Sequence, residues 1–182
     1  MNGARDAVRF AVFDTALGPC TIAWDGDGIV GTQLPEASEA QARERLFRRF
    51  PDVREAAADS DVQLTIDNIV ALLSGKSSDL SKVRLNMRAV PEFNRRVYEI
   101  TRQISPGDTL TYGAVATRLG ESSAARAVGK ALGENPFPII VPCHRVLAAG
   151  GKLGGFSAPG GVNTKLRLLA IEGGAGPLFA QA

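Results

Sequence analysis

Asn-Pro-Phe-Pro-Ile-Ile-Val-Pro-Cys-His-Arg-Val, residues 135–146, places the only histidine of the chain, His144, next to Cys143, one of its two cysteines. A cysteine thiolate is a strong nucleophile, and a neighbouring imidazole takes the thiol proton or stabilises the negative charge. Consecutive side chains of an extended segment point to opposite faces, so contact between the two requires a turn or a bridging water. On this dipeptide alone, a reactive thiol and a buried structural cysteine remain equally good interpretations.

The composition is that of a compact globular chain. Its 182 residues are 45% hydrophobic and 22% charged, which suits one or two domains with a sizeable core and argues against disorder or a fibrous repeat. Uninterrupted apolar stretches, such as 139–141, are far shorter than the roughly 20 residues that a membrane helix needs. The N-terminus has no signal-peptide pattern, so we expect a cytoplasmic protein in which Cys20 and Cys143 form no disulfide.

The scarcity of metal-binding residues excludes several classes of enzyme. One histidine and two cysteines cannot form an HExxH zinc site, a histidine-rich metal site or a zinc ribbon with paired CxxC motifs. We therefore expect neither a metal nor a cofactor.

Charge is divided unevenly along the chain. Residues 1–90 carry 11 Lys or Arg and 13 Asp or Glu, whereas residues 91–182 carry 10 and 6. A basic half is typical of a surface that meets a polyanion, although a solvated surface explains so small an excess nearly as often.

Residues 1–90 are expected to form an N-terminal domain with a small antiparallel sheet and helices. Alternating apolar residues, a Gly-Pro break and the turn Asp-Gly-Asp-Gly indicate a meander, and 3.6-residue periodicity indicates the helices. The expected elements are strands at 8–12, 20–24 and 29–34, helices at 37–50 and 61–74, and a polar linker that extends to Ala89.

Residues 91–182 are expected to form a mostly helical C-terminal domain with a short strand at the turn that carries Cys143, which makes the fold class α/β, of the α+β kind. Pro91 suits the first turn of a helix whose apolar residues continue to Ile104. Two short helices, at 111–119 and 124–134, flank a turn containing Gly and form a helix-turn-helix candidate, with Ser122 or Ser123 as a possible cap. Many proteins contain such pairs without binding DNA, so this signal is weak.

The second of these helices has small side chains around a single arginine, Arg126. Its small residues are Ala124, Ala125, Ala127 and Gly129. Such a composition lets a ligand approach the backbone closely, and tight packing against a neighbouring helix explains it as well.

Pro142-Cys143-His144-Arg145-Val146 resembles the active-site signature of the O6-alkylguanine-DNA alkyltransferases, and the chain is similar to the bacterial methylated-DNA–protein-cysteine methyltransferases of that family. The similarity runs from Phe93 to Gly173, whereas the first half resembles the family only in its strand-then-helix layout. The resemblance implies DNA repair by base flipping and irreversible transfer of the alkyl group of O6-alkylguanine, and of O4-alkylthymine, from duplex DNA to an internal cysteine. It also implies a monomer that works once.

The resemblance assigns catalytic roles to five residues. Cys143 is the alkyl acceptor, and His144 is its proton partner through a bridging water. Glu172 matches the carboxylate that holds the imidazole, which the residues alone would suggest to be a solvated charge at a helix end. Asn135 braces the turn that carries the cysteine, and Tyr112 hydrogen-bonds the purine.

The resemblance also implies how DNA is bound. Arg126 matches the arginine that enters the duplex and fills the gap left by the flipped base. The helix of Ala124, Ala125, Ala127 and Gly129 would lie in the narrow minor groove, where small side chains avoid collision.

The glycine-rich segment 150–161 resembles the loop that walls the base pocket. Ser157 would offer a hydrogen bond to guanine O6, and Phe156, where some members have Tyr, would stack on the base. Lys165 either closes this loop or is a solvated helix lysine, and the residues favour the latter. The implied pocket residues are Tyr112, Val146, Phe156 and Ser157.

Two alternatives from other functional classes stay open. A cysteine hydrolase would also use Cys143 and His144, but such enzymes usually bring the histidine from elsewhere in the chain. A non-catalytic sensor or regulator of alkylated DNA would keep the DNA-binding helices; sensors of this family replace the acceptor cysteine, and regulators carry a zinc module that Cys20 alone cannot form.

Overall fold

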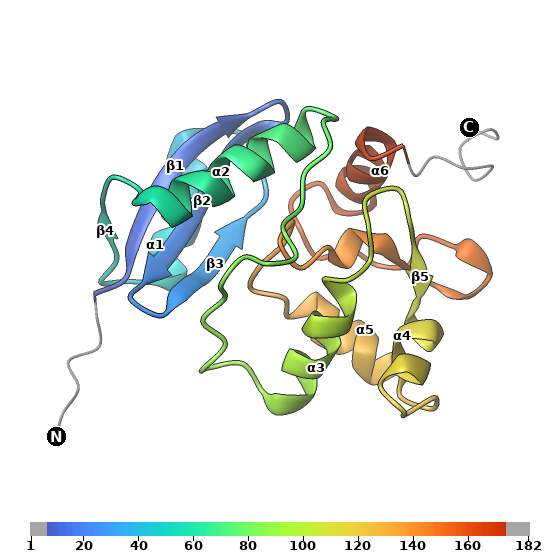
Figure 1. Ribbon diagram of the computed structural model, residues 1–182. Helices are drawn as coiled ribbons and strands as arrows, with labels where there is room; N and C mark the ends of the chain where they lie inside the picture. The colour runs from blue at the N-terminus through green and yellow to red at the C-terminus, as the bar shows by residue number, and fades with distance from the viewer. Residues whose placement is uncertain (1–6, 174–182) are drawn as a thin grey trace, which may run out of the picture.

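The computed structural model describes residues 7–173, which form two parts side by side (Figure 1). The N-terminal part, residues 7–90, contains a sheet and two helices. The C-terminal part, residues 91–173, consists mainly of helices and of the loops between them. The mixed α+β class predicted from the sequence is confirmed.

A four-stranded sheet with the order β3-β2-β1-β4 forms the N-terminal part. Strands β1 (Arg9–Thr15), β2 (Gly18–Asp25) and β3 (Gly28–Gln33) are antiparallel neighbours, which confirms the predicted meander. Strand β4 (Arg54–Glu55) pairs with β1 in the parallel direction. It was not expected, because two residues are too few to show an alternating pattern.

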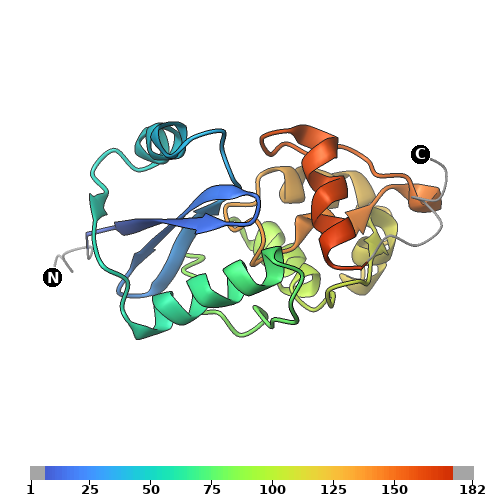
Figure 2. The ribbon, with the colours of Figure 1, turned by 90° about the horizontal axis from the view of Figure 1, so that it is seen from above.

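Helices α1 (Glu39–Arg49) and α2 (Ser60–Leu73) lie on opposite faces of the sheet, as Figure 2 shows. Side-chain caps set where each begins: the Ser38 hydroxyl accepts from the backbone of the first turn of α1, and the Asp59 carboxylate does the same for α2. Both helices begin and end within about two residues of the positions that the periodicity predicts.

The C-terminal part contains the predicted helix-turn-helix and the predicted short strand next to Cys143. Its elements are α3 (Glu92–Thr101), β5 (Leu110–Thr111), α4 (Tyr112–Arg118), α5 (Ala125–Gly133), the 3-10 turn η1 (Cys143–Arg145), β6 (Val146–Leu147), the 3-10 turn η2 (Ala149–Gly151) and α6 (Gly161–Ile171). Strands β5 and β6 pair in parallel, so the chain after the cysteine is fixed to the start of the helix-turn-helix.

The prediction that Ser122 or Ser123 caps α5 is wrong. The cap position is occupied by Ala124, which makes no side-chain hydrogen bond. Helix α4, in contrast, has a side-chain cap: the Thr111 hydroxyl accepts a hydrogen bond from the amide of Ala114 at 3.0 Å. The start of α5 therefore has no side-chain cap, although the sequence offers two serines just before it.

One buried hydrophobic cluster extends through both parts. It includes Trp24 and Ile69 of the N-terminal part and Val97, Val128 and Phe137 of the C-terminal part, each at most 1% exposed. The two parts therefore share a core, and the position of the loops in one part depends on packing against the other.

Replacing Ile69 in α2 by Ala should lower the free energy of unfolding by about 2–5 kcal/mol, because it leaves a cavity in the shared core. The matched control is Leu64→Ala in the same helix, whose side chain is 61% exposed and whose loss should cost less than about 0.5 kcal/mol. Urea unfolding of both variants measures the difference, and equal losses would contradict the assignment of Ile69 to the core.

Candidate active site

Cys143 begins a tight turn and is only half-buried. Its amide donates to the carbonyl of Val141 at 2.8 Å, and the amide of Arg145 donates to that of Pro142 at 2.9 Å. The backbone is thus not extended at Cys143 and His144. The alternation that places neighbouring side chains of a strand on opposite faces does not apply to them.

Asn135 ties together the two ends of the loop before the cysteine. Its side-chain amide donates to the carbonyl of Val141 at 2.9 Å, and its side-chain oxygen accepts from the amide of Phe137 at 2.9 Å. Both functions of the amide are used, which a carboxylate or an alkyl side chain could not reproduce.

A buried ionic cluster lies next to Cys143 in the chain. Glu172, at the C-terminal end of α6, accepts from Nε2 of His144 at 2.9 Å and from Nη2 and Nε of Arg145 at 2.7 and 2.9 Å. The side chains of His144 and Glu172 are 1% and 2% exposed. A third arginine bond, from Nη1 to the carbonyl of Ile104, connects the cluster to the loop after α3.

Charges in this cluster are fixed by its contacts. Burial by itself raises the pKa of Glu172, but hydrogen bonds from His144 and Arg145, together with the positive charge of Arg145, outweigh it and hold the pKa at about 2. Burial lowers the pKa of His144 against the opposing effect of Glu172, so the imidazole is neutral near neutral pH. An ionised carboxylate only accepts, so the imidazole proton lies on Nε2.

The second ring nitrogen of His144 is therefore a proton acceptor. Nδ1 is buried and has no hydrogen-bond partner among residues 7–173. Burial raises the pKa of the Cys143 thiol, while the side chain of Asn135 and the charge of Lys165 lower it. A thiol that is protonated at neutral pH needs a base to become a nucleophile, and the next residue in the chain carries a neutral imidazole.

Lys165 in α6 is fully buried, so the interpretation of this residue as a solvated helix lysine is wrong. Its ammonium group donates to the carbonyls of Val146 and Leu153 at 2.7 and 2.6 Å and lies 5.9 Å from the ring centres of Tyr112 and Phe156. Burial lowers its pKa to about 8, against the opposing effect of Cys143. Lys165 thus ties the glycine-rich segment 150–161, called the wall loop below, to β6. This matches the role in closing the loop that the sequence did not favour.

A cavity of about 810 Å³ opens beside the cysteine. The predicted site residues on its wall are Tyr112, Ala125, Arg126, Gly129, Asn135, Cys143, Phe156 and Ser157. Other predicted residues lie away from the wall: His144 and Glu172 are buried in the ionic cluster, and Val146 is fully buried in β6. Ala124 occupies the cap of α5, and Ala127 is exposed on it.

Gly154 allows the wall loop to approach Tyr112. It has a φ of +69°, and a Cβ atom there would lie 3.1 Å from the Tyr112 hydroxyl oxygen. A larger residue would combine backbone strain with a collision at the phenol. The hydroxyl of Ser157 in the same loop donates to the carbonyl of Gly133 at 3.1 Å, which ties the loop to the end of α5.

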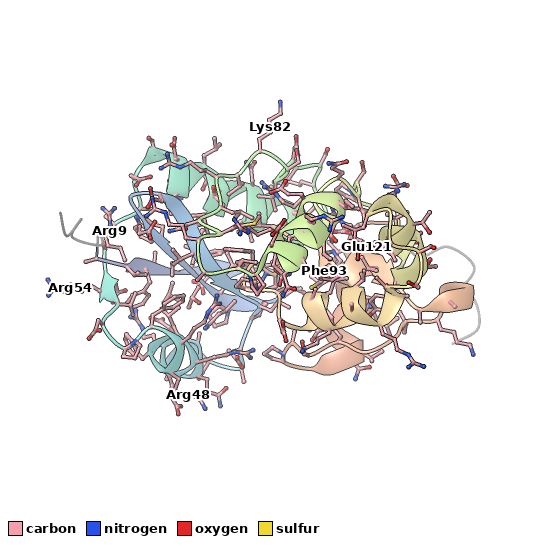
Figure 3. The ribbon with its side chains drawn as sticks, turned by 90° about the horizontal axis from the view of Figure 1, so that it is seen from below. Arg9, Arg48, Arg54, Lys82, Phe93 and Glu121 are labelled. Atoms are coloured by element: carbon pink, nitrogen blue, oxygen red, sulfur yellow. The ribbon has the colours of Figure 1, made fainter. Side chains whose placement is uncertain are left out.

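The turn between α4 and α5 is anchored from α3. Arg96 donates to a carboxylate oxygen of Glu121 at 2.8 Å and to the carbonyl of Leu119 at 2.9 Å. Gly120, between them, has a φ of +80°. In Figure 3, Glu121 lies in the helical half of the molecule, away from the sheet.

Sequence reasoning missed the structural roles of three residues. Arg145 stands inside the quoted motif, yet no spacing rule connects it with a carboxylate 27 positions away. The pattern of α6 gives no sign that Lys165 is buried between two carbonyl groups. Arg45 reaches the cavity wall from the N-terminal part, and only the tertiary structure places it there.

Residues 7–173 contain neither a cluster suited to a metal ion nor a helix suited to a membrane. No group of three or more His, Cys, Asp or Glu side chains in this range is arranged to hold a metal ion. Within the same range, no helix has both the length and the apolar character to cross a bilayer.

The comparisons with known proteins agree on one family. The family model described as "6-O-methylguanine DNA methyltransferase, DNA binding domain" matches residues 92–174. A methylated-DNA–protein-cysteine methyltransferase of Mycobacterium tuberculosis is 34% identical over 165 residues, which cover 91% of this chain and 92% of the relative.

Solved structures extend the likeness to the fold. The crystal structure of Mycobacterium tuberculosis OGT in complex with DNA aligns with a TM-score of 0.73 and 32% identity, covering 91% of this chain and 92% of that one. The O6-methylguanine-DNA methyltransferase of the hyperthermophilic archaeon Pyrococcus kodakaraensis aligns with a TM-score of 0.66 and 27% identity, covering 91% and 99%.

Replacing Glu172 by Gln should lower the free energy of unfolding by about 3–5 kcal/mol at neutral pH, because Arg145 keeps its buried charge without a counterion. The pKa of Glu172 is lower in the folded chain than in the unfolded one, so its stabilising effect is present above the unfolded pKa and is lost as the pH falls towards about 2. Urea unfolding at several pH values between about 5 and 2 should show the two chains converging. A difference that stays constant over this range would contradict an ionised Glu172.

Proposed function

The chain belongs to the family of methylated-DNA–protein-cysteine methyltransferases, and we propose that it repairs O6-alkylguanine in duplex DNA by moving the alkyl group to the sulfur of Cys143. Repair of DNA by alkyl transfer follows from membership of the family. The observation that supports Cys143 as the acceptor is its place on the wall of a cavity of about 810 Å³, with the next residue of the chain, His144, paired with the buried carboxylate of Glu172.

Thiol activation is proposed to run through His144. Its free Nδ1 takes the thiol proton, through a bridging water, and the carboxylate of Glu172 stabilises the imidazolium that forms. The thiolate then attacks the alkyl carbon in line: a sulfur–carbon bond forms, and the carbon–oxygen bond breaks with its electron pair going to guanine. The purine regains neutrality by taking up a proton.

The cavity wall is proposed to bind the flipped base. Burial raises the pKa of Tyr112, which keeps its phenol protonated as a donor to the purine. The Ser157 hydroxyl would turn from Gly133 to donate to guanine O6, where negative charge develops, and Phe156 would stack on the base. O4-alkylthymine is the second substrate that we propose for the same pocket.

Helix α5 is proposed to enter the minor groove. Arg126 is exposed and also lies on the cavity wall, so a base leaving the duplex for the cavity passes next to the guanidinium that would take its place. The small side chains of Ala125 and Gly129 leave room for the groove walls. We place the boundary between a supporting N-terminal domain, 1–90, and a DNA-binding, alkyl-accepting domain, 91–182, before Pro91.

The product is proposed to be permanent. The sulfur of a thioether is a poor leaving group, so we expect neither His144 nor Lys165 to take the alkyl group from Cys143 again. We further propose that the protein acts as a monomer in the cytoplasm, where the thiols of Cys20 and Cys143 stay reduced.

Replacing Cys143 by Ala should abolish transfer from DNA containing O6-methylguanine while leaving binding of that DNA in place. The matched control is Cys20→Ala: Cys20 is fully buried and its pKa is raised to about 12, so it is inert and the variant should transfer like the natural chain. Intact mass and peptide mapping after incubation measure both. Transfer by the Cys143 variant would implicate another acceptor, and binding without transfer by the natural chain would favour a sensor.

Replacing Arg126 by Ala should lower the rate of transfer by about tenfold or more, because the vacated stack loses the side chain that fills it, and unstacking costs a few kcal/mol. Lys130→Ala, in the same helix, is the control: Lys130 is exposed, carries the same charge and lies away from the cavity wall. Single-turnover transfer from a duplex measures both. Equal losses would show that Arg126 acts only as a general positive charge.

A further inference from the structure

The N-terminal part forms hydrogen bonds to the loop that precedes Cys143. In this loop, residues 135–143, the carbonyls of Pro136 and Pro138 point to the end of β3. The amide of Thr32 donates to the carbonyl of Pro136 at 3.1 Å, and the hydroxyl of Thr32 donates to that of Pro138 at 2.7 Å. Thr32 is 2% exposed, so both of its donors are shielded from bulk water, whereas Pro136 and Pro138 are half-buried.

Ile139, which follows the carbonyl of Pro138, has an unfavourable backbone conformation. Ile139 has a φ of +76° and is the only residue other than glycine with a positive φ in the described range 7–173. A β-branched side chain in this region costs of order 1–3 kcal/mol, and such a conformation persists only where its surroundings fix it. The Ile139 side chain is 2% exposed, so its packing in the core helps to hold this backbone conformation.

The strained residue is coupled to the cysteine through short contacts. The amide of Val141 donates to the carbonyl of Phe137 at 2.8 Å, across Ile139, and the carbonyl of Val141 accepts from the amide of Cys143 at 2.8 Å. A change in the backbone conformation of Ile139 would therefore move the carbonyl of Val141, which accepts the hydrogen bond from the amide of Cys143.

A second side chain of the N-terminal part reaches the same loop. Arg49, at the end of α1, donates to the carbonyls of Pro136 and Val30, each at 3.3 Å. Its guanidinium lies over Gly31, where a Cβ atom would be 2.8 Å from Nη1. The neighbouring Arg48 points away from the molecule in Figure 3, so α1 turns one of two adjacent arginines towards the loop.

We propose that Thr32 is a positioning residue for alkyl transfer: its hydroxyl holds the strained turn at Ile139 and thereby keeps the Cys143 sulfur in line with the alkyl carbon. This inference rests on the proposed function and gives the N-terminal part a role in the reaction. Thr32 touches neither substrate nor sulfur and acts only through the loop.

The test replaces the hydroxyl by a methyl group of the same shape. Thr32→Val in the full chain should lower the transfer rate at saturating duplex by about fivefold, the factor that corresponds to about 1 kcal/mol for one lost hydrogen bond, with an unchanged Kd for DNA. Thr32→Ser keeps the hydroxyl and should restore the rate to within about twofold. Amide hydrogen exchange at the non-proline residues of 136–143 should be faster in the valine variant only.

The control is Thr21→Val in the neighbouring strand β2. Thr21 is fully buried and its hydroxyl lies 3.0 Å from the side-chain amide of Gln33, so the change removes a comparable bond away from the loop. This variant should lose stability but keep the transfer rate. Equal rates for the two valine variants would overturn the role of Thr32 while leaving the proposed function intact, whereas a natural chain that transfers nothing would overturn the proposed function itself.

Discussion

The carboxylate of Glu172 is the contact on which the rest of the site depends. It ends α6 and accepts three hydrogen bonds, one from His144 and two from Arg145, in a place where its side chain is 2% exposed. Arg145 also binds the carbonyl of Ile104, so the same cluster joins α6, the cysteine turn and the loop after α3. One buried pair of opposite charges thus sets both the position of the turn and the tautomer of the imidazole.

Reactivity at Cys143 follows from the balance of charges around it. Burial keeps the thiol protonated and the imidazole of the next residue neutral. Lys165 adds a buried positive charge that lowers the pKa of the thiol. The N-terminal part holds the other end of the loop through Thr32, so the cysteine stands between two anchors that come from distant parts of the chain.

Local patterns predicted the meander and the helix-turn-helix, because strand alternation, turn residues and helix periodicity act within a few positions. The pairing of His144 with Glu172 was expected only from the family resemblance, and its role in the reaction stays a prediction. The burial of Lys165 and the part played by Arg145 were missed, because both depend on partners that the fold brings together across many residues. The φ of +76° at Ile139 carries no sequence signal at all, since isoleucine is disfavoured there.

Stoichiometry tests the central claim most directly: Cys143 takes the alkyl group and keeps it. An excess of duplex containing O6-methylguanine is incubated with a known amount of the chain, and the repaired bases are counted over time. The account predicts a plateau at one repaired base per chain, with all of the lost activity recovered only by adding new protein. Repair that continues steadily beyond that point would contradict it.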